Sequence, residues 1–428
     1  MRRYNQKNPP IVQNNKKHGR KRLIFVIGND ALSYISLYNY LINNIKKQYI
    51  KRGMSMNIVV APDSFKGSLS SVRVGETIKK GFKQVIPSSN VTVYPMADGG
   101  EGTIDSLIHS SNGKTYNITV TGSDGDKIDT YYGVLGNEST VIIEVANIVG
   151  LKAINNKDPM NSTTYGIGEI ILHCIKKNYK KFIIGLGGSS TNDGGLGMLQ
   201  ALGINFADQK GECLSYYAKS IFDIHSVDTK GLVPEIKNCE ITVAYDVNNP
   251  LCGKEGATYV YGTQKGVKES ELATLDKAIQ NYAVIIEKEK KDYFQMKKGA
   301  GAAGGLGFAF LFLEAELKPG AQLVADIINL DSKISSADWV ITGEGKSDYQ
   351  SIFGKAPIHV AKLAKKNNVK SLLLSGSLGK GIEELYPYFV SCHSIIPRPL
   401  TLQEAMDDSE LLLFQSSINL SKLINSLS

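Results

Sequence analysis

From residue 57 onward, short runs of β-branched and apolar residues alternate with stretches of helical spacing, and this alternation constrains the fold more than any other feature. Predicted strands are Ile58–Ala61, Val91–Tyr94, Val141–Val145, Phe182–Leu186, Ile241–Ala244, Trp339–Thr342 and Ser371–Leu374. Predicted helices are Val72–Phe82, Gly166–Ile175, Glu269–Glu287 and Pro357–Lys365. Such an order of elements predicts an α/β fold with a mostly parallel sheet.

Most of these strands run directly into a loop rich in Gly or Asp. In open α/β sheets, ligands bind at the carboxyl ends of the strands. The loops that follow the strands are therefore the places where chemistry is expected.

The charge of the chain is unevenly distributed. Residues 1–55 contain twelve Lys and Arg and one acid, Asp30, so the net charge of this segment is +11. Because the whole chain has a net charge of +8, residues 56–428 carry −3. The main body therefore gives no indication of a nucleic-acid partner. The basic segment is either an upstream misreading of the start codon, possible because Met54 and Met56 precede the first strong strand, or a real tail that touches a membrane surface or a partner. Within it, Ala31–Ile50 has the composition of an amphipathic helix.

The cysteine pattern favours a reducing compartment. The five cysteines are odd in number and widely spaced, with no C-x-x-C pair. No apolar run approaches the roughly 18 residues that cross a bilayer, and no cleavage site follows Leu23–Ile27. We expect a cytoplasmic protein without stable membrane insertion.

Two loops set charged side chains among turn residues. Ala61–Ser68 joins a strand to a helix, where backbone N–H groups favour an anion, and Ser64 and Lys66 could hold a phosphate or a carboxylate. Asp98–Thr103 places Asp98 and Glu101 among three glycines. In both loops the alternative is a plain turn, in which Asp63 is only a capping residue and Lys66 is solvated.

A third loop, Gly185–Gly195, follows an apolar strand and precedes the helical residues Met198–Leu202. Its glycines allow a ligand to approach the backbone closely, and its successive N–H groups and hydroxyls could surround a phosphate. The candidate phosphate-binding residues are Gly187, Gly188, Ser189, Ser190 and Thr191, with Asp193 projecting into the same site. The alternative is a flexible surface loop.

Further charges lie among turn residues downstream. Asp246, Glu344 and Asp348 offer the hard carboxylate oxygens that hold Mg²⁺, directly or through water. Lys265 and Lys355 lie in two further Gly-containing turns. Any one of these is typical of a solvated turn, but several on one chain favour a site for metal and phosphate.

Two segments resemble nucleotide-binding motifs, but the residues around them do not match what those motifs require. Gly299–Gly304 fits G-x-G-x-x-G but follows a polar run and not a strand, so it indicates close packing or close ligand approach. Gly345–Ser347 ends like a Walker A loop, but position 340 is Val where that motif needs Gly. The chain therefore has no P-loop, and its six histidines show no paired metal-ligand spacing.

Taken in order, the motifs resemble those of the bacterial glycerate kinase family of the non-P-loop, glycerate 2-kinase type. The resemblance covers residues 57 to about 425 and rests on eight stretches: Asn57–Ser68, Met96–Thr103, Thr163–Glu169, Gly185–Gly203, Asp246–Gly253, Gly262–Gly266, Gly299–Gly307 and Thr342–Pro357. The sequence departs from the family pattern at Tyr245, Asn248 and Lys346, and Asn248 removes one potential metal-binding charge.

The resemblance implies two α/β domains with mostly parallel sheets, one inserted into the other, and an active site in the interdomain cleft. We expect a discontinuous domain at residues 56–116 plus 291–428, an inserted domain at 117–290, and a separate extension at 1–55. The implied activity is ATP-dependent phosphorylation of D-glycerate, with 2-phosphoglycerate favoured over 3-phosphoglycerate. A kinase of another small hydroxy acid and a catalytically silent metabolite sensor are the alternatives, and the oligomeric state is not indicated.

Phosphoryl transfer requires in-line placement and neutralisation of charge on the moving group. We expect Asp193 to act as base or orienter of the attacking hydroxyl, and Lys66 to provide electrostatic stabilisation. ATP is expected at residues 187–191 and Lys355, and Mg²⁺ at Asp246, Glu344 and Asp348. The expected substrate-binding residues are Asp63, Ser64, Asp98, Glu101 and Lys265.

Overall fold

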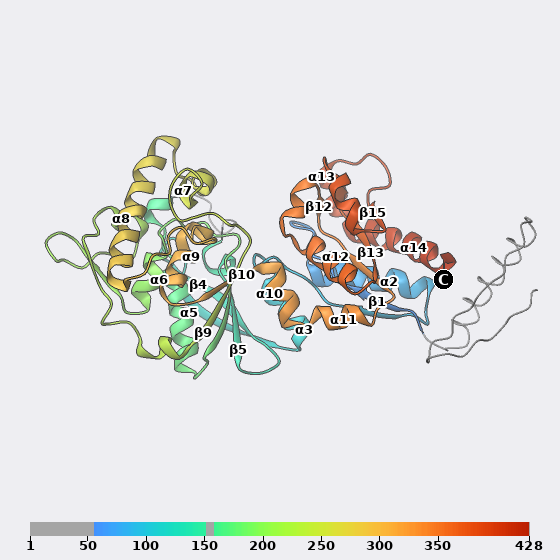
Figure 1. Cartoon of the computed structure of the whole chain (residues 1–428), viewed down its shortest axis with the longest axis horizontal. Helices are drawn as coiled ribbons and strands as arrows, with labels where there is room; N and C mark the ends of the chain where they lie inside the picture. The colour runs from blue at the N-terminus through green and yellow to red at the C-terminus, as the bar shows by residue number, and fades with distance from the viewer. Residues whose placement is uncertain (1–54, 151–157, 428) are drawn as a thin grey trace, which may run out of the picture. The chain divides into compact units, whose positions relative to one another are not determined.

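The computed structural model describes residues 55–150 and 158–427. Within it, Met56–Ser426 form one compact unit built around two large sheets (Figure 1). The predicted extension lies outside the described residues apart from Ser55, and so does the helix predicted at Ala31–Ile50. In the part of the chain that is described, no helix combines the length and the apolar character needed to cross a membrane.

The first sheet has five strands in the order β15, β13, β11, β1, β2, and every neighbouring pair is parallel. They are β1 (Asn57–Val60), β2 (Asn90–Val93), β11 (Trp339–Thr342), β13 (Lys370–Ser375) and β15 (Ser391–Ser394). Successive side chains of a strand point to opposite faces, so Ile58 and Val60 enter one core cluster and Val59 enters another.

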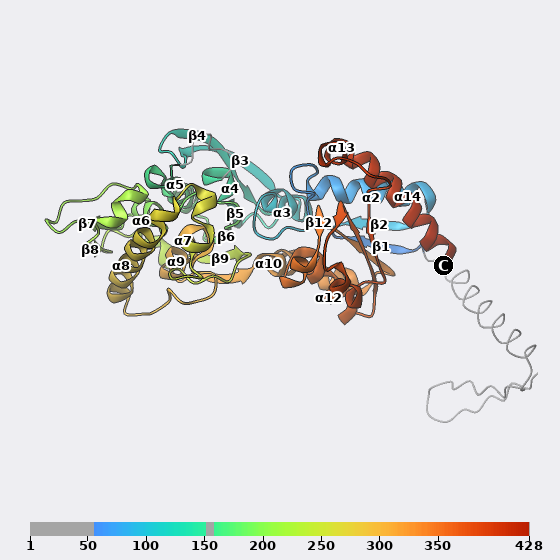
Figure 2. The ribbon, with the colours of Figure 1, turned by 90° about the horizontal axis from the view of Figure 1, so that it is seen from above.

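Helices cover both faces of this sheet, as the apolar character of its central strands requires. Helices α2 (Ser71–Val85) and α14 (Ser409–Leu427) pack with Ile58 and Val60. On the face of Val59 lie α10 (Gly320–Ile327), α11 (Leu330–Ser335) and α12 (Ala356–Lys366), and Figure 2 shows α12 across the sheet from α2 and α14.

The second sheet has six strands in the order β10, β9, β6, β5, β4, β3. They are β3 (Lys114–Thr121), β4 (Lys127–Val134), β5 (Thr140–Glu144), β6 (Lys181–Gly185), β9 (Glu240–Tyr245) and β10 (Glu316–Pro319). The pairs β3–β4 and β4–β5 are antiparallel and the others are parallel.

One face of the second sheet carries the largest core cluster, to which α5 (Tyr165–Lys176), α6 (Leu196–Ala201), α8 (Leu272–Lys290) and α9 (Ala302–Phe312) contribute. Ile142, Ile183 and Ala244 face the other way and share a cluster with Val59, with α10 and with α3 (Thr103–Ser111). Shorter elements are α4 (Ala146–Val149), α7 (Ala257–Tyr261), α13 (Leu402–Asp407), β7 (Asn205–Ala207), β8 (Ser226–Asp228), β12 (Lys346–Ser347) and β14 (Ser377–Leu378).

The structure confirms the mixed α/β class with mostly parallel sheets, and each strand and helix predicted from residue 57 onward is present with ends shifted by a few residues. The hairpin β3–β4 and the edge strands β10 and β15 were not predicted. Strand β3 is mostly exposed and polar, so it lacks the apolar run that identified the buried strands.

The predicted domain limits stay a prediction. Strands from residues 57–93 and 339–394 build the first sheet, and strands from residues 114–319 build the second. Strand β10 pairs along β9, which favours an upper limit of the inserted segment nearer residue 320 than the expected 290.

Candidate active site

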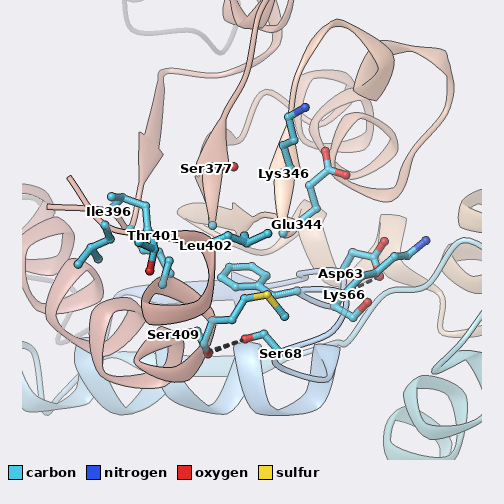
Figure 3. A pocket seen from close by; sticks show the side chains of 18 of the residues that line it. Asp63, Lys66, Ser68, Glu344, Lys346, Ser377, Ile396, Thr401, Leu402 and Ser409 are labelled. Carbon is cyan, nitrogen blue, oxygen red and sulfur yellow. Dashed lines mark hydrogen bonds between the residues drawn. The ribbon is translucent and has the colours of Figure 1, made fainter. Parts of the chain in front are cut away.

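A cavity of about 570 Å³ is lined by the segments that follow β1, β11, β13 and β15 at their carboxyl ends. Backbone hydrogen bonds align the first two of these segments, since Ala61 N donates to Ile341 O and Asp63 N donates to Gly343 O, both at 2.8 Å. Figure 3 shows charged side chains, among them Asp63 and Glu344, on one side of the cavity and Ile396 and Leu402 on the other. The strand-end loops thus form a pocket with two chemically different halves.

Asp63 is a buried carboxylate of this cavity, with 5% of its surface exposed. Its Oδ1 accepts a hydrogen bond from Ser64 N at 2.6 Å. Desolvation, followed by the negative charge of Asp98, raises the pKa of Asp63 to about 7, although Lys66 and the Ser64 N–H oppose the shift. A carboxylate with a pKa near neutrality can accept a proton under physiological conditions.

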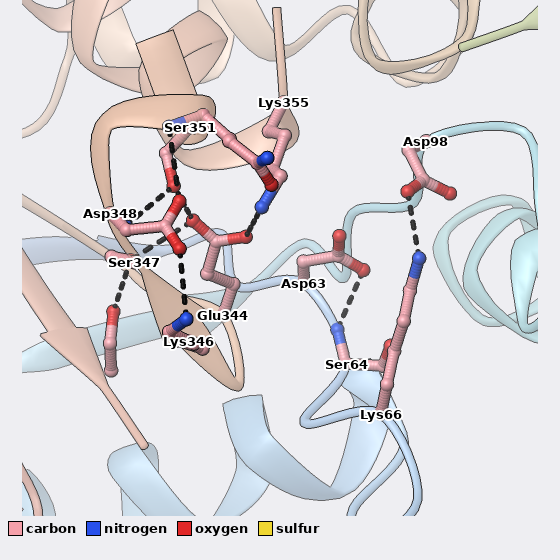
Figure 4. Close-up of polar contacts among 12 residues, drawn as sticks. Asp63, Ser64, Lys66, Asp98, Glu344, Lys346, Ser347, Asp348, Ser351 and Lys355 are labelled. Atoms are coloured by element: carbon pink, nitrogen blue, oxygen red, sulfur yellow. Dashed lines mark hydrogen bonds and ion pairs between the residues drawn. The ribbon is translucent and has the colours of Figure 1, made fainter. Parts of the chain in front are cut away.

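Lys66 lies beside Asp63 and forms an ion pair with Asp98, with 3.1 Å between Nζ and Oδ2 (Figure 4). Burial lowers the pKa of Lys66, but the charges of Asp98 and Asp63 outweigh burial and raise it above its ordinary value. These two charges therefore favour the cationic form of Lys66.

Glu344 and Asp348 form a second charged group, contributed by the loop after β11 (Figure 4). Glu344 Oε1 accepts hydrogen bonds from Ser347 Oγ at 3.0 Å and Ser351 Oγ at 2.6 Å, and Oε2 lies 3.3 Å from Lys355 Nζ. Asp348 pairs with Lys346 at 3.1 Å. Each of these lysines is thus held at the cavity by a carboxylate.

The three acids expected to bind magnesium are not grouped as one ligand set: among residues 55–150 and 158–427, no three His, Cys, Asp or Glu side chains are placed to hold a metal ion. Asp246 is exposed, yet desolvation by the surrounding protein, followed by the charge of Asp98, raises its pKa to about 6. Asp98 raises the pKa of Asp63 as well, so carboxylates from three loops repel one another here.

The Gly-rich loop after β6 packs against the loop that carries Asp98. Gly187 N donates to Gly99 O at 3.0 Å, and a Cβ at Gly187 would lie 2.5 Å from Gly100 Cα. Only glycine permits this contact. The residues Ser189, Ser190 and Thr191 are buried, and Ser190 Oγ donates to Val149 O at 2.8 Å.

Asp193 is fully buried in the same loop. Its carboxylate accepts hydrogen bonds from Thr164 N at 3.0 Å, Thr164 Oγ1 at 2.7 Å, Gly195 N at 3.0 Å and Gly197 N at 3.3 Å. Desolvation raises its pKa and these donors oppose the shift. The contacts join the loop to the start of α5 and α6, which favours a positioning role for Asp193 over that of a base.

Lys265 is also buried, and its Nζ donates to Ser189 Oγ at 3.0 Å and to Thr191 O at 2.8 Å. Desolvation lowers the pKa of Lys265 to about 7, and the charge of Asp193 opposes this shift. Gly304 has a φ of 67° and contacts the backbone of Thr191, where a Cβ would lie 2.1 Å from the carbonyl oxygen. Of the two alternatives that the sequence left open for Gly299–Gly304, these contacts favour close packing over close ligand approach.

Glu144 is a buried residue that sequence reasoning missed. Its carboxylate accepts hydrogen bonds from Gly102 N at 3.1 Å and Ile104 N at 3.2 Å, at the start of α3, and desolvation raises its pKa to about 7. It fixes the loop that carries Asp98 and the exposed Glu101. The available signal was a single acid inside the apolar run Val141–Val145.

The structure thus separates the predicted site residues into two groups. Around the cavity it brings together Asp63, Ser64, Lys66, Asp98, Glu344 and Lys355, and also Lys346. Ser189, Ser190, Thr191, Asp193 and Lys265 are buried, and none of them lines that cavity. Asp246 is close enough to raise the pKa of Lys66, and Gly187 joins the two groups through Gly99.

Comparison with known proteins gives a consistent result. The model of the "Glycerate kinase family" matches residues 58–425. A glycerate kinase of Halalkalibacterium halodurans is 39% identical over 367 residues, which cover 85% of this chain and 97% of the relative. The glycerate 2-kinase of Escherichia coli is 40% identical over 354 residues, 82% of this chain and 93% of the relative.

A solved structure agrees with these relatives. A crystal structure from Salmonella typhimurium LT2, described as a candidate glycerate kinase 2, superposes with a TM-score of 0.79 and 36% sequence identity. The match covers 87% of this chain and 99% of that one.

Proposed function

Because the chain belongs to the glycerate kinase family, we propose that it transfers the γ-phosphoryl group of ATP to the 2-hydroxyl of D-glycerate. The observation that carries this proposal is the cavity at the strand ends, where the buried carboxylate of Asp63 lies among lysines. The 2-position is favoured by the likeness to the glycerate 2-kinase of Escherichia coli.

Asp63 is the proposed base. The hydroxyl oxygen of glycerate attacks the γ-phosphorus, the bond from that phosphorus to the β,γ-bridging oxygen breaks, and ADP leaves. The hydroxyl proton passes to Asp63, whose pKa of about 7 suits it to accept a proton and then release it to solvent. The sequence predicted Asp193 as the base. Because the Asp193 carboxylate already accepts four hydrogen bonds from the protein, we favour Asp63 for this role.

The lysines supply the positive charge that phosphoryl transfer requires. Lys66 and Lys355 line the cavity. Lys66 forms an ion pair with Asp98 and Lys355 with Glu344, and each ion pair holds the ammonium group in place. Charge developing on the transferred group and on the leaving oxygen is stabilised by such preorganised cations. We assign Lys66 to the acceptor side, beside Asp98, and Lys355 to the phosphates of the nucleotide.

Asp246 suits Mg²⁺, because desolvation and then the negative charge of Asp98 raise its pKa, and a divalent cation would offset both. When bound, Mg²⁺ would neutralise charge on the phosphate oxygens. Of the predicted ligands, Asp246 is the best supported, whereas Glu344 and Asp348 are paired with lysines. All three stay proposals.

The remaining predicted residues are proposed to position the acceptor. Gly187 lies where the Gly-rich loop meets the loop of Asp98, and the next residue, Gly188, is exposed. Lys265 would act through Ser189 and Thr191, and Asp193 through Thr164, by holding this loop in shape. Ser64, Asp98 and Glu101 remain proposed contacts for glycerate.

Phosphorus NMR of reaction mixtures tests the proposal. The protein is incubated with ATP, Mg²⁺ and either D-glycerate, L-glycerate, glycolate or D-lactate. We expect ADP and a new phosphomonoester signal with D-glycerate and at most weak signals with the other acids. A stronger signal with another acid would indicate a kinase of that acid, and binding of glycerate without any product would indicate a metabolite sensor.

A further inference from the structure

The half of the cavity that faces away from the charged residues is apolar. Phe65, which is 3% exposed, follows β1, while Ile395 and Ile396 follow β15. Leu402 and Met406 come from α13. These side chains line the same cavity as Glu344 and Lys346, and Figure 3 shows Ile396 on the side away from those two residues.

Local interactions fix the segments that carry this apolar half. Thr401 begins α13 with a capping box, in which Glu404 N donates to Thr401 Oγ1 at 3.2 Å and Thr401 N donates to Glu404 Oε2 at 2.8 Å. Ser68 Oγ and Ser409 Oγ are hydrogen bonded at 2.6 Å, which joins the loop after β1 to α14 (Figure 3). Leu402, fixed at the first turn of α13, is nevertheless 77% exposed.

We infer that this apolar half binds the purine base and ribose of the nucleotide, between Phe65 and the segment 395–406, with the phosphates directed to Lys346 and Lys355. A nucleoside triphosphate has a matching pair of ends, because its base is largely apolar and its phosphates are anionic. The volume of about 570 Å³ is within the range of roughly 300–1,000 Å³ typical of small-molecule pockets. An exposed apolar side chain such as Leu402 gains by being covered.

The Gly-rich loop offers no comparable place for a base. The side chains of Ser189, Ser190 and Thr191 are buried and do not line the cavity. The hydroxyls of Ser189 and Ser190 are engaged with Lys265 and with the Val149 carbonyl. Sequence reasoning expected ATP at 187–191, whereas the inference places only the acceptor side there. It rests on the proposed function, because it assumes that the donor is a nucleotide.

Photoaffinity labelling with 8-azido-ATP locates the base directly. After irradiation and proteolysis, we expect label on residues 395–409 or on Phe65, and we expect excess ATP to prevent it. Label on residues 185–195 that ATP prevents would overturn the inference without touching the proposed function, because the protein would still bind ATP.

Calorimetric titration supplies an independent test. The double variant Leu402→Gln with Met406→Gln removes apolar contacts while keeping length and charge, and is expected to weaken binding of the non-hydrolysable analogue AMP-PNP about tenfold or more. Binding of inorganic tripolyphosphate should stay within about twofold, since the lysines are untouched. The control is Leu411→Gln with Leu423→Gln, two exposed leucines of α14 that do not line the cavity.

The possible failures are distinguishable. Unchanged AMP-PNP affinity in the Leu402 and Met406 variant, in a protein that still phosphorylates D-glycerate, would overturn the inference alone. Absence of both turnover and AMP-PNP binding in the unmodified protein would overturn the proposed function together with the inference.

Discussion

Asp63→Asn is expected to lower kcat by roughly a hundred- to ten-thousand-fold, the usual contribution of a general base, while the protein stays folded. Asn keeps the shape of Asp and an oxygen that accepts the Ser64 N–H, but it cannot take a proton. Because Asp63 is buried close to Asp98 and Glu344, removal of its charge should leave the melting temperature unchanged or raise it. The matched control is Asp331→Asn, which removes a surface carboxylate paired with Lys366.

The pH dependence of the unmodified enzyme should report the same group. Burial, Asp98 and Glu344 raise the pKa of Asp63, whereas Lys66 and the Ser64 N–H lower it, with a net value of about 7. The base works only when deprotonated, so kcat/KM should fall as the pH drops through this value and should level off above it. If Asp63→Asn keeps a nearly normal kcat and its kcat/KM still falls at low pH as in the unmodified enzyme, this role for Asp63 is contradicted.

Asp193→Asn is expected to destabilise the protein instead. All the described hydrogen bonds of Asp193 come from N–H or O–H donors, and the NH₂ group of Asn would confront some of them. Hydrogen bonds to a charged group contribute about 1.5–3 kcal/mol each, so loss of two would lower the free energy of unfolding by roughly 3 kcal/mol or more. Urea denaturation measures this change directly.

A double-mutant cycle with Thr164→Val separates the two roles of Asp193. Thr164 Oγ1 donates to Asp193 and accepts from Met198 N at 3.0 Å, so both single variants should be less stable and the double variant should lose less than their sum. A base would behave differently, because Asp193→Asn would then lower kcat at unchanged stability. That outcome would restore the role predicted from sequence.

The sequence could predict the position of a site residue when the neighbouring strand determines it, and could not when contacts with distant segments determine it. Asp63, Lys66 and Glu344 follow apolar strands, and the rule that parallel strands place their carboxyl ends at one edge was sufficient to bring them together. Asp193 also lies in a strand-end loop, and Lys265 lies in a short turn after α7, but whether a polar side chain there faces a ligand or the protein depends on distant segments. Here those segments are the start of α5 and residues 299–304.

The apolar half of the cavity could not be predicted for a related reason. Ile395, Leu402 and Met406 have the spacing of any surface helix and its preceding loop, and only the folded chain brings them to the same cavity as Phe65. Glu144 was overlooked because strand assignment rested on its apolar neighbours. Strands β3 and β15 are polar and lack the apolar alternation by which a strand is recognised from sequence alone. Their pairing with neighbouring strands is visible only in the structure.

The product assay tests the central claim most directly. The protein is supplied with ATP, Mg²⁺ and D-glycerate, and enolase is added without phosphoglycerate mutase while phosphoenolpyruvate is followed by absorbance. We predict immediate formation of phosphoenolpyruvate, because enolase acts on 2-phosphoglycerate as it is made. No signal until the mutase is added would show that the 3-hydroxyl is phosphorylated, and no signal even then would contradict the assignment as a glycerate kinase.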